Sequence, residues 1–256
     1  MTTHLTILTG ASRGMGAAMA EALLREGQHL LCIARGTHAG LADIAGAHGG
    51  LVEQWRADLA DPAPVAERLE AWLFTQDPAA CASVTLVNNA AAIARLTPLE
   101  ASGSGDLVRA LRVGLEAPLL LTAAFLRATA TWPARAAGAC KVLNISSGLG
   151  RRAMASQAAY CAVKSGLDHF TRAVALDQAA SAHPARVVSL APGVIDTDMQ
   201  VQIRGADPAH FPDHARFVEL KAGGHLDSPE AAARKVIAYL RRPDFGAQPV
   251  ADVRDP

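Results

Sequence analysis

Three polar residues near the middle of the chain have the types and spacing that a proton-transfer site requires: Ser147, Tyr160 and Lys164. Tyr160 and Lys164 are four residues apart in an Ala-rich helical pattern, so their side chains share one helix face. Because a nearby ammonium favours the phenolate, we expect Lys164 to lower the pKa of Tyr160. Ser147 follows a predicted strand, residues 140–145, and its hydroxyl would hold a substrate oxygen beside the phenol. A Tyr–Lys pair alone is more typical of a surface contact, so the interpretation depends on the other motifs.

Composition excludes several classes of protein. The 256 residues are 50% hydrophobic, and 24 Lys and Arg balance 24 Asp and Glu, which predicts neither a nucleic-acid partner nor a membrane surface. No apolar run reaches the length of a membrane span and the start resembles no signal peptide, so we expect a cytoplasmic protein. The four cysteines are widely spaced, which predicts buried thiols and no metal site.

A glycine-rich turn follows the first predicted strand, residues 5–8. It reads Thr9-Gly10-Ala11-Ser12-Arg13-Gly14-Met15-Gly16 and opens a predicted helix over residues 17–26. Glycines permit unusual backbone angles, and the N–H groups at a helix N-terminus favour the charge of a pyrophosphate. A strand before the turn and a helix after it predict a dinucleotide site.

The second predicted strand, residues 29–34, ends in Arg35. Dinucleotide folds more often have an acidic residue there, which binds the 2′-hydroxyl of the adenosine ribose. Arg35 and Arg13 would instead attract a 2′-phosphate, so the sequence favours NADP(H) over NAD(H). Two solvated surface arginines are the alternative.

Strand and helix patterns alternate along the rest of the chain. This alternation predicts one α/β domain: a doubly wound parallel sheet of about seven strands, with helices on both faces and a ligand crevice at the carboxyl ends of the strands. We expect the dinucleotide-binding half to cover about residues 1–150, and a mobile substrate lid to cover about residues 196–224. The further predicted strands are residues 50–55, 84–87, 140–145, 186–190 and 249–253, and the further helices are residues 105–130 with a kink at Pro118, 160–180 and 228–241, with another beginning near Pro62.

Several strand-end residues have two interpretations. Asp58 would accept a hydrogen bond from the adenine amino group, or cap the helix that begins near Pro62. Asn88 and Asn89 would bridge strand ends and line the cofactor groove, or form an ordinary turn. Arg151 and Arg152 would favour an anionic substrate, although solvated loop arginines are more typical.

These motifs, in this order and spacing, make the whole chain similar to the short-chain dehydrogenase/reductase family. Residues 191–200, 219–221 and 246–252 further resemble the subgroup of sepiapterin reductases and bacterial benzil reductases. The resemblance implies a Rossmann-type enzyme, a homodimer or homotetramer, that moves a hydride between NADP(H) and a small ketone or diketone.

The resemblance also implies roles for single residues. Tyr160 would protonate the substrate oxygen, Lys164 would hold the nicotinamide ribose, and Ser147 would orient the substrate. Substrate contacts are expected at Ser147, Gly148, Tyr160, Gly193 and Asp252, the last anchoring an amino group, with Asp255 as its alternative. Cofactor contacts are expected at Gly10, Ser12, Arg13, Gly14, Met15, Gly16, Arg35, Asp58, Leu59, Asn89, Ala90, Tyr160, Lys164, Pro192, Gly193, Ile195 and Thr197.

Two positions depart from the family pattern. Gly114 stands where many members have an asparagine that supports a proton relay, and Ala91 replaces a glycine. A reductase of 3-oxoacyl thioesters or hydroxysteroids and a non-catalytic NADP(H) sensor are the alternative functions, although a sensor has no need of Tyr160. Small residues on the Tyr160 helix, such as Ala162 and Gly166, would admit a partner subunit's helix or simply pack in the core.

Overall fold

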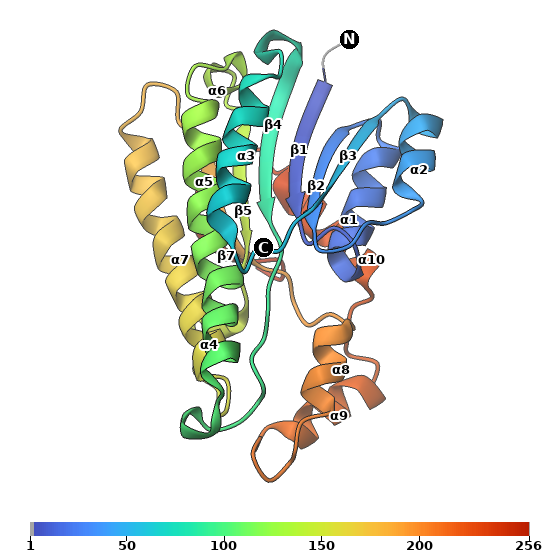
Figure 1. Cartoon of the computed structure of the whole chain (residues 1–256), viewed down its shortest axis with the longest axis vertical. Helices are drawn as coiled ribbons and strands as arrows, with labels where there is room; N and C mark the ends of the chain where they lie inside the picture. The colour runs from blue at the N-terminus through green and yellow to red at the C-terminus, as the bar shows by residue number, and fades with distance from the viewer. Residues whose placement is uncertain (1–2, 256) are drawn as a thin grey trace.

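The computed structural model describes residues 3–255, so the ends of the predicted domain, residues 1–2 and 256, lie outside it. A single seven-stranded parallel sheet in the order β3-β2-β1-β4-β5-β6-β7 forms the centre of the molecule (Figure 1). The strands are β1 Thr3–Thr9, β2 His29–Ala34, β3 Leu51–Arg56, β4 Cys81–Asn88, β5 Cys140–Ile145, β6 Arg186–Ala191 and β7 Val250–Asp252.

Helices cover both faces of this sheet (Figure 1). One apolar cluster joins the sheet to α3, α5 and α7, and a second joins its other face to α1, α2 and α10. The doubly wound α/β architecture is therefore confirmed. The helices are α1 Gly14–Arg25, α2 Leu41–His48, α3 Pro62–Phe74, α4 Ser104–Leu111, α5 Ala117–Ala128, α6 Pro133–Ala136, α7 Ala158–Ala179, α8 Asp198–Arg204, α9 His214–Ala222 and α10 Pro229–Leu240, with short 3-10 turns at Pro78–Ala80, Leu99–Ala101 and Gly148–Gly150.

The predicted helix over residues 105–130 is divided into α4, a wide π-helical turn at Arg112–Glu116, and α5. In the wide turn the Ala117 N–H donates to the carbonyl of Arg112, five residues earlier. Pro118 follows at once, and it lacks the N–H that an α-helix would direct to the carbonyl of Gly114. The irregularity expected at Pro118 thus takes the form of a π turn ahead of the proline.

The segment predicted as a lid contains two packed helices, α8 and α9, which lie beyond the carboxyl edge of the sheet (Figure 1). Phe211 and Phe217 stack with ring centroids 5.6 Å apart in a third apolar cluster. The backbones of Ile195 and Asp227 pair at the base of the segment. Its mobility stays a prediction.

None of the helices within residues 3–255 combines the length and the hydrophobicity that a membrane span requires.

Candidate active site

A buried lysine fixes the geometry of the site. Lys164 is 3% exposed, and its Nζ donates a 2.7 Å hydrogen bond to the carbonyl of Ile145, the last residue of β5. This bond attaches the first half of α7 to the end of the strand from which Ser147 departs. Tyr160, one helical turn before Lys164, consequently reaches the Ser147 hydroxyl, to which it is hydrogen-bonded. The structure therefore brings together the three residues that the sequence singled out.

The pKa of Tyr160 differs from the expectation. Burial raises it to about 12, and the hydrogen bond with Ser147 opposes this only in part. Lys164 Nζ lies 5.5 Å from the centroid of the Tyr160 ring and is directed to the Ile145 carbonyl. The predicted lowering of the phenol pKa is thus wrong for this arrangement, because the desolvation of the phenolate outweighs the effect of its hydrogen bond with Ser147.

A buried carboxylate lies one turn beyond Lys164. Asp168 is 1% exposed, and its Oδ1 accepts 2.6 Å hydrogen bonds from the hydroxyls of Ser146 and Ser189, at the ends of β5 and β6. Burial lowers the pKa of Lys164 to about 8, while the negative charge of Asp168 acts in the opposite direction. Sequence analysis missed Asp168, although its spacing of four residues from Lys164 places it on the same helix face.

Arg151 connects this carboxylate to the last strand. Its Nε lies 3.4 Å from Asp168 Oδ2, and its Nη2 donates a 2.7 Å hydrogen bond to the carbonyl of Ala251 in β7. Arg151 is exposed, as expected for a loop arginine, but these contacts also give it a structural role that the sequence did not indicate. Arg152 is exposed, as expected.

The carboxylate of Asp252 is already paired within the chain. Asp252 is 5% exposed and accepts hydrogen bonds from Arg254 Nε at 2.7 Å and Nη2 at 2.5 Å, and Arg151 Nη1 lies 3.9 Å away. The hydrogen bond from Arg254 holds the pKa of Asp252 below its ordinary value. Asp255 accepts a 3.1 Å hydrogen bond from the Asp252 backbone N–H. The contacts described for Asp252 are therefore those of a structural ion pair.

The glycine-rich turn forms a tight cradle against the end of β4. A side chain at Gly16 would place its Cβ 2.1 Å from the Gly10 carbonyl oxygen, and Gly10 itself has a φ of +71°. Asn89 donates to the carbonyl of Thr9 at 2.9 Å, and the Thr9 hydroxyl accepts from the N–H groups of Asn89 and Ala90. Sequence analysis placed Thr9 in the glycine-rich turn but assigned no role to its hydroxyl.

The segment after β6 faces this cradle. A Cβ at Gly14 would lie 3.5 Å from Thr197 Cγ2, so the expected cofactor position Thr197 lies opposite the glycine-rich turn. α1 begins at Gly14 with no acidic residue in its first turn. A backbone that permits close approach and the N–H groups of the helix N-terminus suit the pyrophosphate of a dinucleotide.

The expected adenine end carries three charged residues. Arg35 is exposed, while Arg13 forms an exposed 2.8 Å ion pair with Asp198. Asp58 accepts a 3.0 Å hydrogen bond from the Ala60 N–H and pairs with Arg109 at 3.3 Å. The N-cap of α3 is Asp61, so Asp58 does not cap that helix as one interpretation proposed.

The two asparagines after β4 have different partners. Asn88 donates to Asn144 Oδ1 at 2.8 Å, and Asn144 donates to Thr171 at 2.9 Å, which ties the ends of β4 and β5 to α7. Asn89 instead supports the glycine-rich turn. The expected bridging of neighbouring strand ends is thus observed for Asn88.

Fold and site together define a Rossmann-type oxidoreductase. The model of the short chain dehydrogenases matches residues 4–207, and the chain belongs to that family.

Relatives with known activity span nearly the whole chain. A benzil reductase that forms (S)-benzoin, from Bacillus cereus, is 32% identical over 239 residues, 93% of this chain and 94% of the relative. A sepiapterin reductase from Xenopus tropicalis is 32% identical over 248 residues, covering 92% and 90%. The structure of a metagenomic short-chain oxidoreductase in complex with NADP superimposes with a TM-score of 0.69 at 28% identity, covering 95% and 93%.

The first prediction concerns Gly114, where an asparagine would collide with α7. Its Cβ would lie 2.5 Å from Val163 Cγ1, and Val163 is 1% exposed. We expect Gly114→Asn to lower the free energy of unfolding by roughly 1–3 kcal/mol, and Val163→Ala in the same chain to restore part of the loss, because the smaller side chain removes the overlap. Urea denaturation of both single variants and the double variant measures this coupling. Gly46→Asn, where a Cβ meets nothing within 4 Å, is the matched control. Strictly additive effects of the two changes would contradict the collision.

The second prediction follows from the lowered pKa of Lys164. The amine binds its proton up to about pH 10.5 when unfolded but releases it near about 8 in the folded chain. Between these values the unfolded state binds more protons, so this contribution to the free energy of unfolding rises with pH, by at most about 1.4 kcal/mol per pH unit. Cys32 and Cys140, whose pKa values burial raises, contribute with the opposite sign.

Comparing the wild type with a variant that lacks the amine isolates the contribution of Lys164 to the pH dependence. We expect the free energy of unfolding of the wild type minus that of Lys164→Met to increase between about pH 8 and about pH 10, as measured by urea denaturation at constant ionic strength. A difference that stays constant over this interval would mean that the pKa of Lys164 is not lowered.

Proposed function

We propose that this protein is an NADPH-dependent carbonyl reductase acting on a small ketone or diketone. The observation that carries the proposal is the arrangement of Ser147, Tyr160 and Lys164 at the end of β5, beside the glycine cradle at the end of β1. The cradle would hold the pyrophosphate, and the side chains from β5 and α7 would hold the reacting carbonyl.

Each of the three side chains has one task in this proposal. When bound, the reduced nucleotide supplies a hydride to the carbonyl carbon. Tyr160 transfers its phenolic proton to the carbonyl oxygen as the C=O bond becomes a C–O single bond, and the raised pKa keeps that proton in place at neutral pH. Ser147 donates to the same oxygen and orients it. Lys164 fixes α7 against β5 and would reach the nicotinamide ribose.

The two arginines beside the adenine end support a preference for NADPH. Arg35 is exposed at the end of β2, and Arg13 precedes α1. Guanidinium groups bind the 2′-phosphate of NADPH by charge-assisted hydrogen bonds. The uncharged ribose hydroxyl of NADH cannot form such bonds. The Asp198 carboxylate that pairs with Arg13 is itself exposed, so this pair opens at little cost.

We expect Arg35→Asp to reverse the cofactor preference, because a carboxylate repels the 2′-phosphate and accepts from the ribose hydroxyl. The ratio of kcat/KM with NADPH to kcat/KM with NADH should fall by about tenfold or more, which steady-state kinetics at one ionic strength measures. Arg56→Asp, an exposed arginine at the end of the neighbouring strand β3, is the charge-matched control. An equal fall with both nucleotides would reject the proposed phosphate contact.

The partners of Asp252 support a neutral diketone over a substrate anchored by an amine. Its carboxylate is bound by Arg254 and lies near Arg151, so a cationic group of a substrate would have to compete with two guanidinium groups already in place. Among the relatives, the benzil reductase therefore offers a better guide to the substrate than the sepiapterin reductase.

The assay follows NADPH absorbance with benzil, phenylpropanedione, diacetyl and sepiapterin. We expect turnover with at least one diketone, and we expect Tyr160→Phe to lower kcat by about 10²–10⁴-fold while NADPH binding is unchanged, since only the proton donor is lost. Tight NADPH binding without turnover of any carbonyl would instead favour a nucleotide-sensing protein.

We also propose that the protein forms a homodimer or homotetramer. Apolar side chains that are strongly exposed in the single chain support this: Val108 and Leu111 on α4 and Leu176 on α7. Gly166 cannot serve as an open contact point, because a Cβ there would lie 3.2 Å from Leu115 of the same chain. Light scattering should report two or four subunits, and Leu111→Asp should shift the mass toward one. A monomeric wild type would contradict the proposal.

A further inference from the structure

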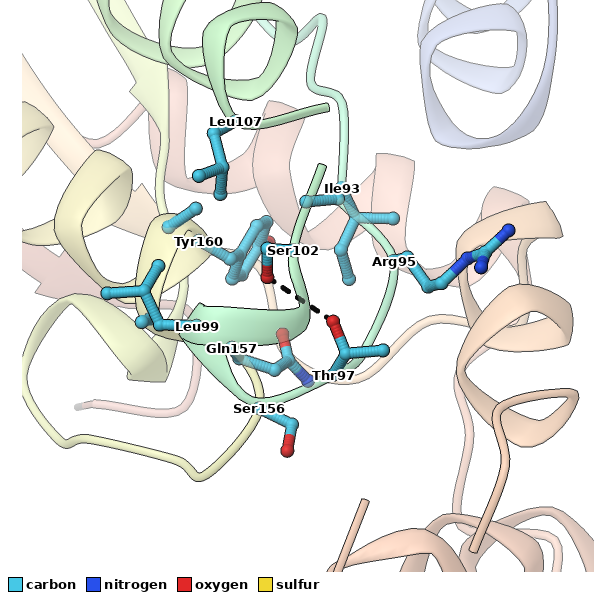
Figure 2. Close-up of a pocket in the computed structure, with 12 residues that line it drawn as sticks. Ile93, Arg95, Thr97, Leu99, Ser102, Leu107, Ser156, Gln157 and Tyr160 are labelled. Carbon is cyan, nitrogen blue, oxygen red and sulfur yellow. Dashed lines mark hydrogen bonds between the residues drawn. The ribbon is translucent and has the colours of Figure 1, made fainter. Parts of the chain in front are cut away.

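A cavity beside Tyr160 has one polar atom without a partner. The wall is formed by the loop that precedes α4 and by the turn that leads into α7 (Figure 2). Its apolar side chains include Ile93, Leu99 and Leu107, and the side chain of Gln157 also lines it. Gln157 is 4% exposed, and its Oε1 is buried with no hydrogen-bond partner.

The orientation of this amide is determined by its neighbour. Gln157 Nε2 donates to the sulfur of Met154 at 3.5 Å. The opposite orientation would place two acceptors, the amide oxygen and the thioether sulfur, against each other. The unpartnered group is therefore an acceptor, and leaving it unmatched in a buried position costs free energy.

The backbone around Gln157 is held rigidly. Ser156 has a φ of +60°, and its hydroxyl donates a 2.5 Å hydrogen bond to the carbonyl of His210, in the segment between α8 and α9. The carbonyl of Gln157 accepts from the Cys161 N–H in the first turn of α7. A left-handed conformation at a serine is unfavourable and persists only where its surroundings impose it. The amide is thus placed one turn before Tyr160 by fixed contacts.

The side-chain hydroxyls of Thr97, Ser102 and Ser156 already have partners, and the exposed guanidinium of Arg95 points away from the cavity (Figure 2). The hydroxyls of Thr97 and Ser102 lie 3.3 Å apart, and Ser102 donates to the carbonyl of Pro98 (Figure 2). An incoming group therefore meets apolar walls and one open acceptor. A hydroxyl group of a ligand can donate a hydrogen bond to this acceptor, whereas a carbonyl group cannot.

We propose that Gln157 is a specificity-determining residue that accepts a hydrogen bond from a hydroxyl group of the substrate. Among the small ketones and diketones of the proposed function, the preferred substrate is then a neutral one that also carries a hydroxyl group. This inference rests on the proposed carbonyl reduction and names the substrate class of the same site. A buried acceptor discriminates strongly, because a substrate without the donor leaves it unsatisfied.

The experiment compares acetophenone with 2-hydroxyacetophenone and its three ring-hydroxylated isomers. For the wild type, kcat/KM should favour at least one hydroxylated ketone over acetophenone by about tenfold or more. Gln157→Met, which keeps the length and removes the acceptor, should reduce that ratio by about tenfold while kcat/KM for acetophenone stays within about threefold. The quantity compared is the ratio of kcat/KM for a hydroxylated ketone to kcat/KM for acetophenone. Dividing this ratio for the wild type by the same ratio for the variant cancels the intrinsic reactivity of each ketone.

Two further variants separate recognition from packing. Gln157→Glu retains an acceptor and should retain the preference, and Thr97→Val, in the same cavity, should leave the ratio unchanged. Equal losses on all ketones in Gln157→Met, or no preference in the wild type, would overturn the inference. Saturation-transfer NMR of the same ketones with NADP⁺ tests the hydroxyl preference without turnover. If hydroxylated ketones bind preferentially but none is reduced, the role of Gln157 is supported and the proposed reductase activity is contradicted. If ketones are reduced without any preference for a hydroxyl group, the reductase activity is supported and the role of Gln157 is contradicted.

Discussion

The whole site depends on one buried hydrogen bond, from the ammonium of Lys164 to the carbonyl of Ile145. An ammonium in a buried position is expensive, and here the cost is offset by the strand-end carbonyl and by the charge of Asp168 one turn away. Asp168 is in turn held by the hydroxyls of Ser146 and Ser189. Through these contacts a single helix, α7, is locked to the ends of two strands, and Tyr160 acquires its place as a consequence.

The carboxyl edge of the sheet is organised by several such polar contacts rather than by apolar packing. Asn88 and Asn144 join β4 to β5, and Asn89 joins the end of β4 to the glycine-rich turn. Arg151 extends the set to β7 through Ala251. In the rest of the sheet the two apolar clusters hold the helices against its two faces. The polar contacts at the carboxyl edge determine how the strand ends and loops are positioned relative to one another. The residues of the candidate site and the polar contacts that hold the strand ends together therefore lie at the same edge of the sheet.

Features that arise from local pattern could be predicted from the sequence. Strands β2 and β5 were predicted residue for residue, because each is an apolar run with clear boundaries, and the helix start at Ser228 and Pro229 was evident from its capping residues. Tertiary environment could not be predicted in the same way. Burial reversed the expected direction of the Tyr160 pKa, and the carboxylate that pairs with Arg151 lies 17 residues further along the chain, at Asp168. The π turn before Pro118 was missed because its residues have the same propensities as an α-helix.

A direct titration of Lys164 tests most clearly whether Asp168 stabilises the positive charge of Lys164. The chain has four lysines, Lys141, Lys164, Lys221 and Lys235, so ¹³C labelling of their ε-carbons gives few NMR signals, and Lys164→Met assigns the relevant one. We predict a pKa of about 8 for Lys164 in the wild type, and a lower value in Asp168→Asn, which keeps an acceptor for Ser146 and Ser189 but removes the negative charge. An ordinary lysine pKa in the wild type, or the same pKa in both proteins, would contradict the electrostatic coupling.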